Sequence, residues 1–290
     1  MSTAQPEDGG GPIVRRMQLG ARLRSLRESK GITREKAGYT IRGSESKISR
    51  MELGRVGFKE RDVTDLLLLY GVADQREHDR LLALTREANA PGWWQPYNDL
   101  LAQWFQMYLG LEEAASLMRT YEVQFVPGLL QTEAYARAVI MLGHGQADTT
   151  ELTRRVELRM RRKQILDRPH KPRLWAVLDE AVLRRPIGGT AVLREQIAAL
   201  IELCDHPGIR LQVLPFHKGG HAAAGGAFTI LRFPLADIPD TVYIEQLTTA
   251  QYLDKREDVD RYSAAVAKLF IEAEHPDDTP AILRAALKDL

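Results

Sequence analysis

The 290-residue chain contains a single cysteine, Cys204, and this scarcity limits its chemistry. One thiol cannot form an internal disulfide, which fits a reducing cytoplasm, although a lone thiol excludes little. No cysteine and histidine cluster has the spacing of a structural zinc site, so we expect no metal and no cofactor. Long hydrophobic runs are also lacking, since nothing reaches the roughly 18 apolar residues that a membrane span needs. We therefore expect a cytoplasmic protein with no membrane partner.

Catalytic motifs are absent as well. The chain has no nucleophile elbow, no HExxH and no glycine loop of the phosphate-binding kind. Five polar groups of the second half could still perform acid–base chemistry or hold a metal: Asp179, Glu180, His217, His221 and Glu245. We expect Glu180 and Glu245 instead to hold backbone groups or to pair with arginines. The chain is therefore not expected to be an enzyme, and we assign no catalytic residue.

Charge is unevenly distributed, although the net charge is only +1. Residues 13–61 carry 14 lysines and arginines against five glutamates, and the rest of the chain is acidic overall. One basic segment in a nearly neutral chain suggests a polyanion-binding module joined to another domain, and a solvated helix surface is the alternative. Residues 1–12 lack the features of a signal peptide, and we expect them to be disordered.

Helical periodicity dominates the first 90 residues. Leu19, Leu23 and Leu26 follow the i, i+4, i+7 spacing of one helix face. Thr33 and Ser44 are suitable N-caps for the second and third helices. Five short helices are expected, at residues 18–30, 34–39, 45–53, 60–70 and 75–89. The tight turn between the second and third helices predicts a helix-turn-helix, and we assign residues 13–90 to this domain.

DNA contacts can be assigned from this arrangement, because the third helix of a helix-turn-helix enters the major groove. Its outward face offers Glu45, Ser46, Lys47 and Arg50 for base edges. Phosphate contacts are expected from four arginines near the turn: Arg22, Arg34, Arg42 and Arg55.

Residues 19–54 resemble the Xre/lambda-repressor-like helix-turn-helix family. The matching pieces are Leu19-Gly20, Leu26-Arg27, Gly31-Ile32-Thr33, and the run from Ser46 to Glu52 with Gly54. The resemblance implies that Arg34 contacts the DNA backbone and that Ser44, Glu45, Ser46, Lys47 and Arg50 read the operator. Gly38 departs from the family pattern, and a glycine inside a helix costs about 1 kcal/mol relative to alanine. A helix-turn-helix retained only for protein contacts is the alternative.

After Pro91-Gly92 the pattern changes, and we place a domain boundary there. A helix is expected over residues 100–118, and an arginine-rich helix over residues 150–167. Short β-prone segments follow at residues 174–178, 209–214, 228–233, 242–245 and 250–253. We predict an α+β domain over residues 91–275, with a small sheet of about five strands, and a C-terminal helix over residues 276–290.

This second part resembles the regulatory domain of actinobacterial antitoxin-like Xre regulators. The resemblance is carried by Trp93-Trp94, Tyr108 to Ala115, Tyr121-Glu122, Val126 to Tyr135, Leu178 to Ala181, Val213 to Phe216, Gly219, Phe228 and Val242 to Glu245. It implies a regulator that is often paired with a small protein encoded beside it, and it implies no known ligand.

Two other features leave alternatives open. Four aromatic residues could line a ligand pocket, or could belong to the core or to a domain interface: Trp93, Trp94, Trp104 and Phe105. The arginine-rich helix within residues 151–167 could contact DNA or an acidic partner, and a solvated helix with internal Glu–Arg pairs is the default interpretation.

The sequence favours a homodimeric regulator that binds double-stranded operator DNA. Its second domain would supply dimerisation and would receive a partner or ligand. Dimers of such modules bind half-sites about one helical turn apart. The alternative is an antitoxin-like protein that binds a small acidic partner from a neighbouring gene and uses DNA binding for autoregulation.

Overall fold

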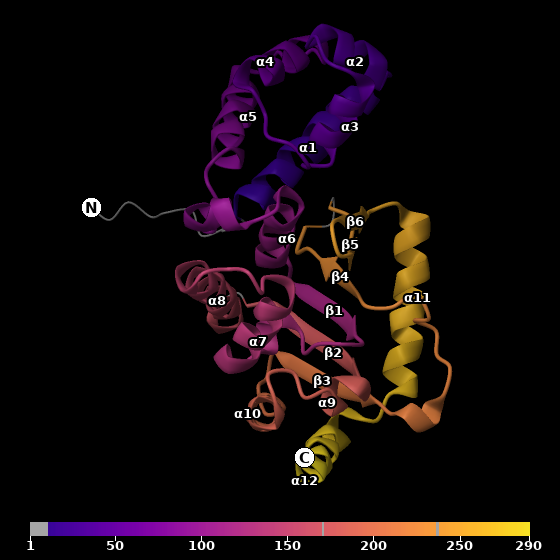
Figure 1. The fold of residues 1–290 in the computed structure, drawn as a ribbon. Coiled ribbons are helices and arrows are strands. Elements are labelled where there is room, and N and C mark those ends of the chain that lie inside the picture. The colour runs from indigo at the N-terminus through magenta and orange to yellow at the C-terminus, as the bar shows by residue number, and fades with distance from the viewer. Residues whose placement is uncertain (1–10, 170, 236–237) are drawn as a thin grey trace, which may run out of the picture. The chain divides into compact units, whose positions relative to one another are not determined.

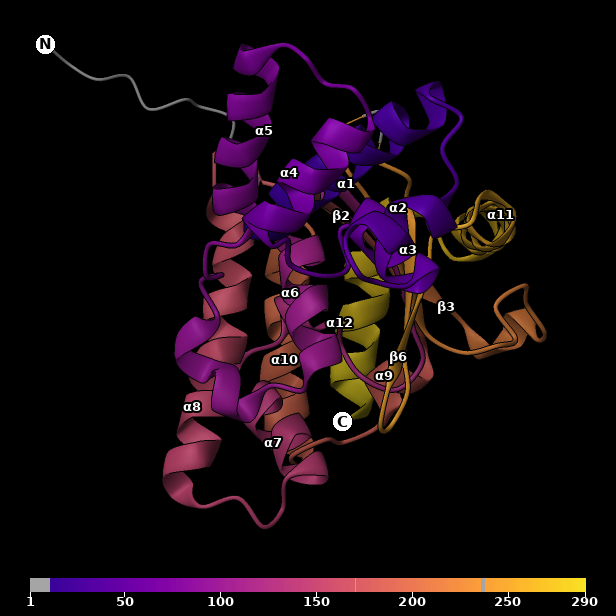
Figure 2. The same ribbon diagram turned by 90° about the horizontal axis from the view of Figure 1, so that it is seen from above.

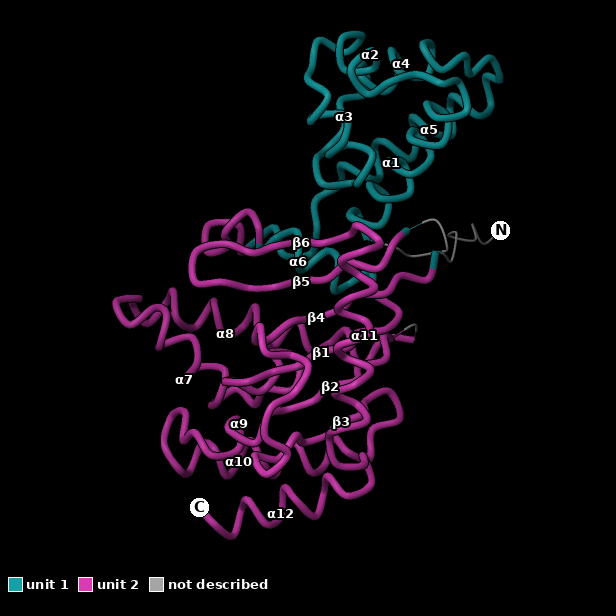
Figure 3. The backbone as a smooth tube through the Cα atoms, turned by 90° about the vertical axis from the view of Figure 1, so that its right-hand side faces the viewer, with its two compact units in different colours: residues 1–96, 105–114, 235–238 teal, residues 97–104, 115–234, 239–290 magenta. Residues whose placement is uncertain are grey.

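The computed structural model describes residues 11–169, 171–235 and 238–290. The chain divides into two compact units, drawn in two colours in Figure 3. Unit 1 comprises residues 1–96, 105–114 and 235–238, and unit 2 comprises residues 97–104, 115–234 and 239–290.

Unit 1 is helical, and the five predicted helices are confirmed (Figure 1). They are α1 (Pro12–Ser29), α2 (Arg34–Thr40), α3 (Glu45–Glu52), α4 (Glu60–Leu69) and α5 (Gln75–Ala88). Most of α6 (Gln103–Ala114) also belongs to this unit. Helix α1 begins at Pro12, a position where the missing N–H costs no helical hydrogen bond. The disorder predicted for the N-terminus falls largely on residues 1–10, which lie outside the described residues.

Both predicted caps of the helix-turn-helix are present. The Thr33 hydroxyl accepts from the Lys36 N–H over 3.2 Å, and the Ser44 hydroxyl accepts from the Lys47 N–H over 3.2 Å. The apolar sides of the five helices enclose one core, whose buried members include Leu19, Leu23, Ile48, Met51, Val63, Leu66, Leu67, Tyr70 and Leu81. Ile48 and Met51 of α3 belong to this core, with each residue 1% exposed.

Two glycines of unit 1 allow close packing of backbone on backbone. A Cβ on Gly20 of α1 would lie within 2.7 Å of the Glu52 carbonyl oxygen. A Cβ on Gly38 of α2 would lie 3.0 Å from the carbonyl carbon of Ser44. The loss of helix propensity expected at Gly38 therefore accompanies a close approach of α2 to the turn before α3, which a larger side chain would hinder.

Unit 2 is built on a six-stranded mixed sheet in the order β3-β2-β1-β4-β5-β6. Strands β1 (Leu117–Glu122), β2 (Arg173–Asp179) and β3 (Ile209–Leu214) are parallel. Strands β4 (Phe228–Arg232), β5 (Thr241–Glu245) and β6 (Ala250–Leu253) continue the sheet in antiparallel fashion from β1.

Strand β1 corrects the sequence prediction, which gave about five strands and continued a helix to residue 118. Helix α6 ends at Ala114, and Leu117 and Met118 already pair with both β2 and β4. The strand occupies the middle of the sheet. Its two hydrogen-bonded neighbours come from distant parts of the chain, so no local pattern could reveal it. The predicted class, a helical first domain followed by an α+β domain, is confirmed.

Helices cover both faces of this sheet. Figures 1 and 2 show α11 (Arg256–Glu272) on one face, and α7 (Glu133–Gly143), α8 (Thr149–Lys163) and α10 (Thr190–Leu203) on the other. Helices α9 (Ala181–Arg184) and α12 (Thr279–Asp289) complete the unit, together with 3₁₀ segments at Gln95–Leu100, Gly128–Leu130, Gln164–Asp167, Phe216–Lys218 and Pro276–Asp278, the first of which begins in unit 1.

The contact between the sheet and α11 forms one apolar core of unit 2. Val266 and Leu269 of α11 are fully buried against Tyr121, Val177 and Ile230 of the strands. At one side of this core the rings of Trp175 and Phe270 stack with centroids 3.8 Å apart. In the described ranges, no helix is both long and apolar enough to cross a membrane.

Candidate nucleic-acid interface

The turn between α2 and α3 holds α3 in a defined orientation. Arg42 takes a left-handed conformation with φ of 53°, which is uncommon for a residue other than glycine. The Gly43 N–H donates to the Gly38 carbonyl over 2.8 Å, so the end of α2 is closed by a hydrogen bond across the turn. Ser44 then caps α3 at once. The start of α3 is thus held by the hydrogen bond that closes α2 and by the Ser44 cap.

The outward side of α3 carries the residues expected to read bases. Glu45, Ser46 and Arg50 are exposed, and Ile48 and Met51 on the opposite side are buried. The Arg50 Nε donates to the Ser46 carbonyl over 3.4 Å, which places the guanidinium along the first turns of the helix. Ser44, at the cap, is also exposed.

Lys47 differs from these neighbours because its charge is already paired within the protein. Its Nζ donates to Asp62 Oδ2 of α4 over 2.6 Å, and the Asp62 side chain is only 2% exposed. The ammonium group therefore reaches across to α4, whereas Glu45, Ser46 and Arg50 remain on the surface.

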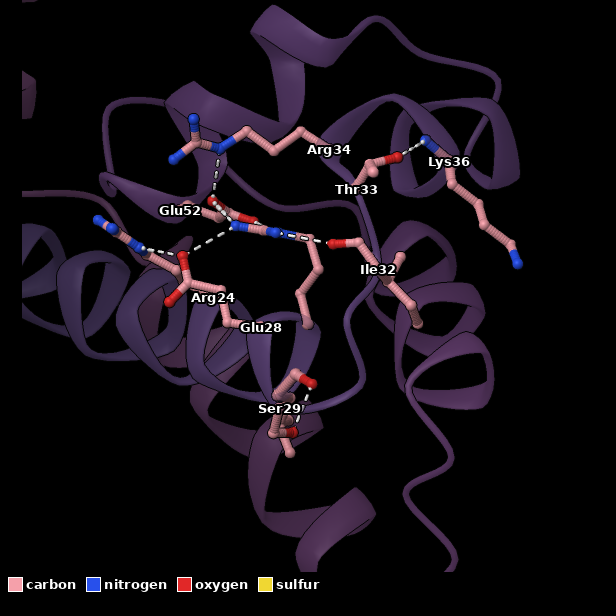
Figure 4. Close-up of polar contacts among 10 residues, drawn as sticks. Arg24, Glu28, Ser29, Ile32, Thr33, Arg34, Lys36 and Glu52 are labelled. Atoms are coloured by element: carbon pink, nitrogen blue, oxygen red, sulfur yellow. Dashed lines mark hydrogen bonds and ion pairs between the residues drawn. The ribbon is translucent and has the colours of Figure 1, made fainter.

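Arg34, the predicted phosphate contact at the start of α2, is positioned by a buried carboxylate. Its Nε donates to Glu52 Oε2 over 3.0 Å (Figure 4). The same Oε2 accepts from Arg27 of α1 over 3.1 Å, and Arg27 also donates to the Ile32 carbonyl over 2.8 Å. The hydrogen bond to Glu52 raises the pKa of Arg27 above its usual value. Glu52 thus joins α1, α2 and α3, and Figure 4 shows the Nη nitrogens of Arg34 turned away from it.

The other predicted phosphate contacts have different surroundings. Arg22 of α1 is exposed and pairs with Glu77 of α5, with its Nε 3.1 Å from Glu77 Oε1. Arg42 is exposed at the tip of the turn, and Arg55 follows α3, where its backbone N–H donates to the Arg50 carbonyl over 2.8 Å.

Sequence reasoning missed two buried residues that hold this surface in place and one exposed residue on it. Glu52 and Asp62 were not assigned roles, since their partners Arg34 and Lys47 are 18 and 15 residues away and no local spacing signals either pair. Tyr39, at the end of α2, is 87% exposed. Because tyrosine hydroxyls bond to DNA phosphates, an exposed tyrosine in a helix-turn-helix is the signal that could have found it.

The four aromatic residues proposed for a pocket fall in different places. Trp93, Trp94 and Phe105 belong to unit 1, and Trp104 belongs to unit 2. Trp94 is 6% exposed and meets Trp93 edge-on, with ring centroids 5.9 Å apart. A Cβ on Gly110 of α6 would lie 3.1 Å from the Trp94 ring, so this indole packs on a helix as a core residue does.

The arginine-rich helix α8 is largely engaged inside unit 2. Arg154 makes two hydrogen bonds to Asp99, of 2.6 and 2.8 Å. Arg159 donates to Gln131 over 2.9 Å, and Arg162 is only 6% exposed. The expected internal pair exists as Arg155–Glu151 at i,i+4, but these other contacts show that the helix is not simply a solvated one.

Polar groups at the ends of the strands in unit 2 pair with one another. The Tyr121 hydroxyl lies 3.3 Å from Asp179 Oδ2 and 3.0 Å from His221 Nε2. Glu180 accepts from the Phe216 N–H and pairs with an arginine, as predicted, and Glu245 accepts from the Tyr243 hydroxyl over 2.7 Å. His217 lies 3.8 Å from Glu274, away from this group. Within the described ranges, no group of three or more potential ligands could hold a metal ion.

Glu122, the last residue of β1, has a carboxyl group whose pKa lies far from its ordinary value. Burial, and then the nearby charge of Glu245, raise its pKa to about 8, although Arg159 and a hydrogen bond from Thr120 act in the opposite direction. None of the ion pairs among the described residues includes Glu122. The sequence resemblance included Glu122, but nothing local indicated this environment.

Comparison with known families agrees with the geometry of unit 1. Residues 18–81 match a family described as Helix-turn-helix domain. Unit 1 is therefore a helix-turn-helix domain, the kind that DNA-binding regulators carry. This follows from the match, from the five helices, and from the capped third helix with its exposed polar side.

The family to which the chain belongs is shown by a match over the larger part of its length. Residues 105–285 match the family described as Domain of unknown function (DUF5753), and the chain belongs to it. No curated protein and no solved structure matches the chain. The narrower resemblances, to Xre and to antitoxin-like regulators, remain predictions.

Proposed function

We propose that the chain is a sequence-specific DNA-binding transcription regulator, in which α3 enters the major groove of an operator. The observation that carries this proposal is the arrangement of α3. Its capped first turns present Glu45, Ser46 and Arg50 to solvent, and its apolar side is locked into the core. Arginine can donate to guanine, and glutamate can accept from cytosine.

The test is a fluorescence-anisotropy titration of the whole chain. The duplexes are the promoter of its own gene and a scrambled duplex of the same composition, each at two salt concentrations. The proposal expects tight, salt-dependent binding with a clear preference for the promoter. Equal affinity for both duplexes at both salt concentrations would contradict it.

We further propose that the regulator acts as a homodimer in the cytoplasm. A single helix-turn-helix contacts few bases, and a two-fold dimer reads two half-sites about one helical turn apart. Analytical ultracentrifugation at micromolar concentration, with and without operator, tests the dimer. A monomer under both conditions would overturn it.

The assignment of dimerisation, and of partner or ligand reception, to unit 2 rests on the joining of a basic first segment to a larger, mildly acidic domain. The antitoxin-like alternative rests on sequence resemblance. Co-expression with the neighbouring open reading frame, followed by a pull-down, separates them. A stable complex with a small acidic protein supports the antitoxin-like role, and a failure to form one favours ligand sensing.

A further inference from the structure

Among the residues predicted to read bases, Lys47 is the one whose charged group is directed into the protein. Its aliphatic chain crosses the turn, because a Cβ on Gly43 would lie 2.8 Å from Lys47 Cδ. Its Nζ then ends 2.6 Å from Asp62 Oδ2 in the first turn of α4. Both the path of the side chain and its end point are therefore set by neighbouring elements.

Asp62 depends on this contact. The residue is 1% exposed, and its Oδ1 has no hydrogen-bond partner among the described residues. The other nearby cation, Arg61, is 3.7 Å from Oδ1 and largely exposed. A buried carboxylate with one unsatisfied oxygen holds a close cation strongly, since losing the partner would leave an uncompensated charge.

Phosphate groups of DNA would compete for the same ammonium group. A lysine that neutralises a phosphate releases a counterion, and this attraction is the same for every sequence. A lysine already neutralised by the protein adds no such attraction. We propose that Asp62 withholds Lys47 from DNA, so that α3 reads bases through Glu45, Ser46 and Arg50 while its sequence-independent attraction to phosphates is kept low. This inference rests on the proposed DNA-binding function.

Asp62→Asn tests the inference, because asparagine keeps the shape of the side chain and removes the charge that holds Lys47. One additional phosphate contact should steepen the slope of log K against log salt by about 0.9, and strengthen binding to a scrambled duplex about fivefold at 0.15 M salt. Asp65→Asn is the matched control. Asp65 lies on the same helix, and its removal changes the net charge by the same amount without freeing Lys47.

Anisotropy titrations of the whole chain compare the wild type, both single variants and the double variant Asp62→Asn/Lys47→Met. The inference expects the gain in Asp62→Asn only, with less than a twofold change in Asp65→Asn and no gain in the double variant. Equal behaviour of Asp62→Asn and Asp65→Asn, or a gain that persists in the double variant, would overturn it.

A measurement without DNA separates this inference from the proposed function. In a lysine acetylation experiment followed by mass spectrometry, Lys47 of the wild type should be modified much more slowly than the exposed Lys36. In Asp62→Asn the two lysines should be modified at similar rates. Equal rates of modification in the wild type would refute the inference. A wild type that binds both duplexes alike would instead refute sequence-specific regulation, and the comparison of the two asparagine variants would still decide the role of Asp62.

Discussion

Arg34 at the start of α2 donates to Glu52 at the end of α3, and Glu52 simultaneously accepts from Arg27 of α1. The Glu52 side chain is 2% exposed and the Arg27 side chain 8% exposed. This carboxylate therefore fixes the positions of the three helices on which the predicted DNA contacts depend.

Substitution Glu52→Gln should destabilise unit 1 by about 3–5 kcal/mol, because it removes the buried countercharge of Arg27 and leaves only the half-exposed Glu28 beside that guanidinium. Amide hydrogen exchange of peptides from α1 to α3 should accelerate accordingly. Glu28→Gln is the control. Glu28 also contacts Arg27 but is half exposed, so its loss should cost less than about 1 kcal/mol. Similar exchange rates in the two variants would argue against a central role for Glu52.

Arg50→Ala should weaken binding to the promoter by about 1–3 kcal/mol and relax base choice, as expected of a base-edge contact. Arg34→Ala is the companion variant. It should weaken binding to every sequence alike and flatten the salt dependence, as a phosphate contact would. Titrations against promoter and scrambled duplexes check both, and equal losses on both duplexes for Arg50→Ala would exclude base reading by that residue.

Glu122 should make the stability of unit 2 depend on pH. Its pKa in the folded protein is about 8, against 4.5 for an ordinary glutamate, so between these values the folded state binds a proton that the unfolded state releases. This contribution to stability is complete below pH 4.5 and is lost as pH rises to about 8, by at most about 1.4 kcal/mol per pH unit.

Glu122→Gln removes that dependence. Urea unfolding at several pH values should show the variant gaining stability over the wild type as pH rises, with the difference levelling above pH 8. Glu245→Gln removes a neighbouring charge that raises the Glu122 pKa, so it should move the levelling point to lower pH. A difference between Glu122→Gln and the wild type that stays constant with pH would show that the carboxyl titrates normally.

Gly20→Ala should destabilise unit 1 by about 1–3 kcal/mol, because the added methyl would collide with the carbonyl oxygens that end α3. Gly143→Ala is the matched control at the end of α7, where a Cβ meets nothing within 4 Å. Thermal unfolding compares the two. A stabilising effect of Gly20→Ala, as helix propensity alone would give, would mean that α1 and α3 are not in backbone contact.

The sequence by itself determined the elements whose signals are local. Leu19, Leu23 and Leu26 lie on one helix face, and Thr33 and Ser44 cap the next two helices, because periodicity and capping involve residues only a few positions apart. The helix-turn-helix, the helical first domain and the α+β class of the second domain followed from such patterns.

Tertiary structure alone decided the pairings between distant residues. Strand β1 forms because it pairs with β2 on one side and with β4 on the other. The sequence pattern of its own six residues did not distinguish them from a continuation of the preceding helix. The sequence alone does not distinguish Lys47 from Arg50 as a base-reading residue. In the structure, only Lys47 of these two faces a buried carboxylate, that of Asp62. A buried charge is stabilised by whichever opposite charge the fold brings within reach, and that distance is not encoded in residue spacing.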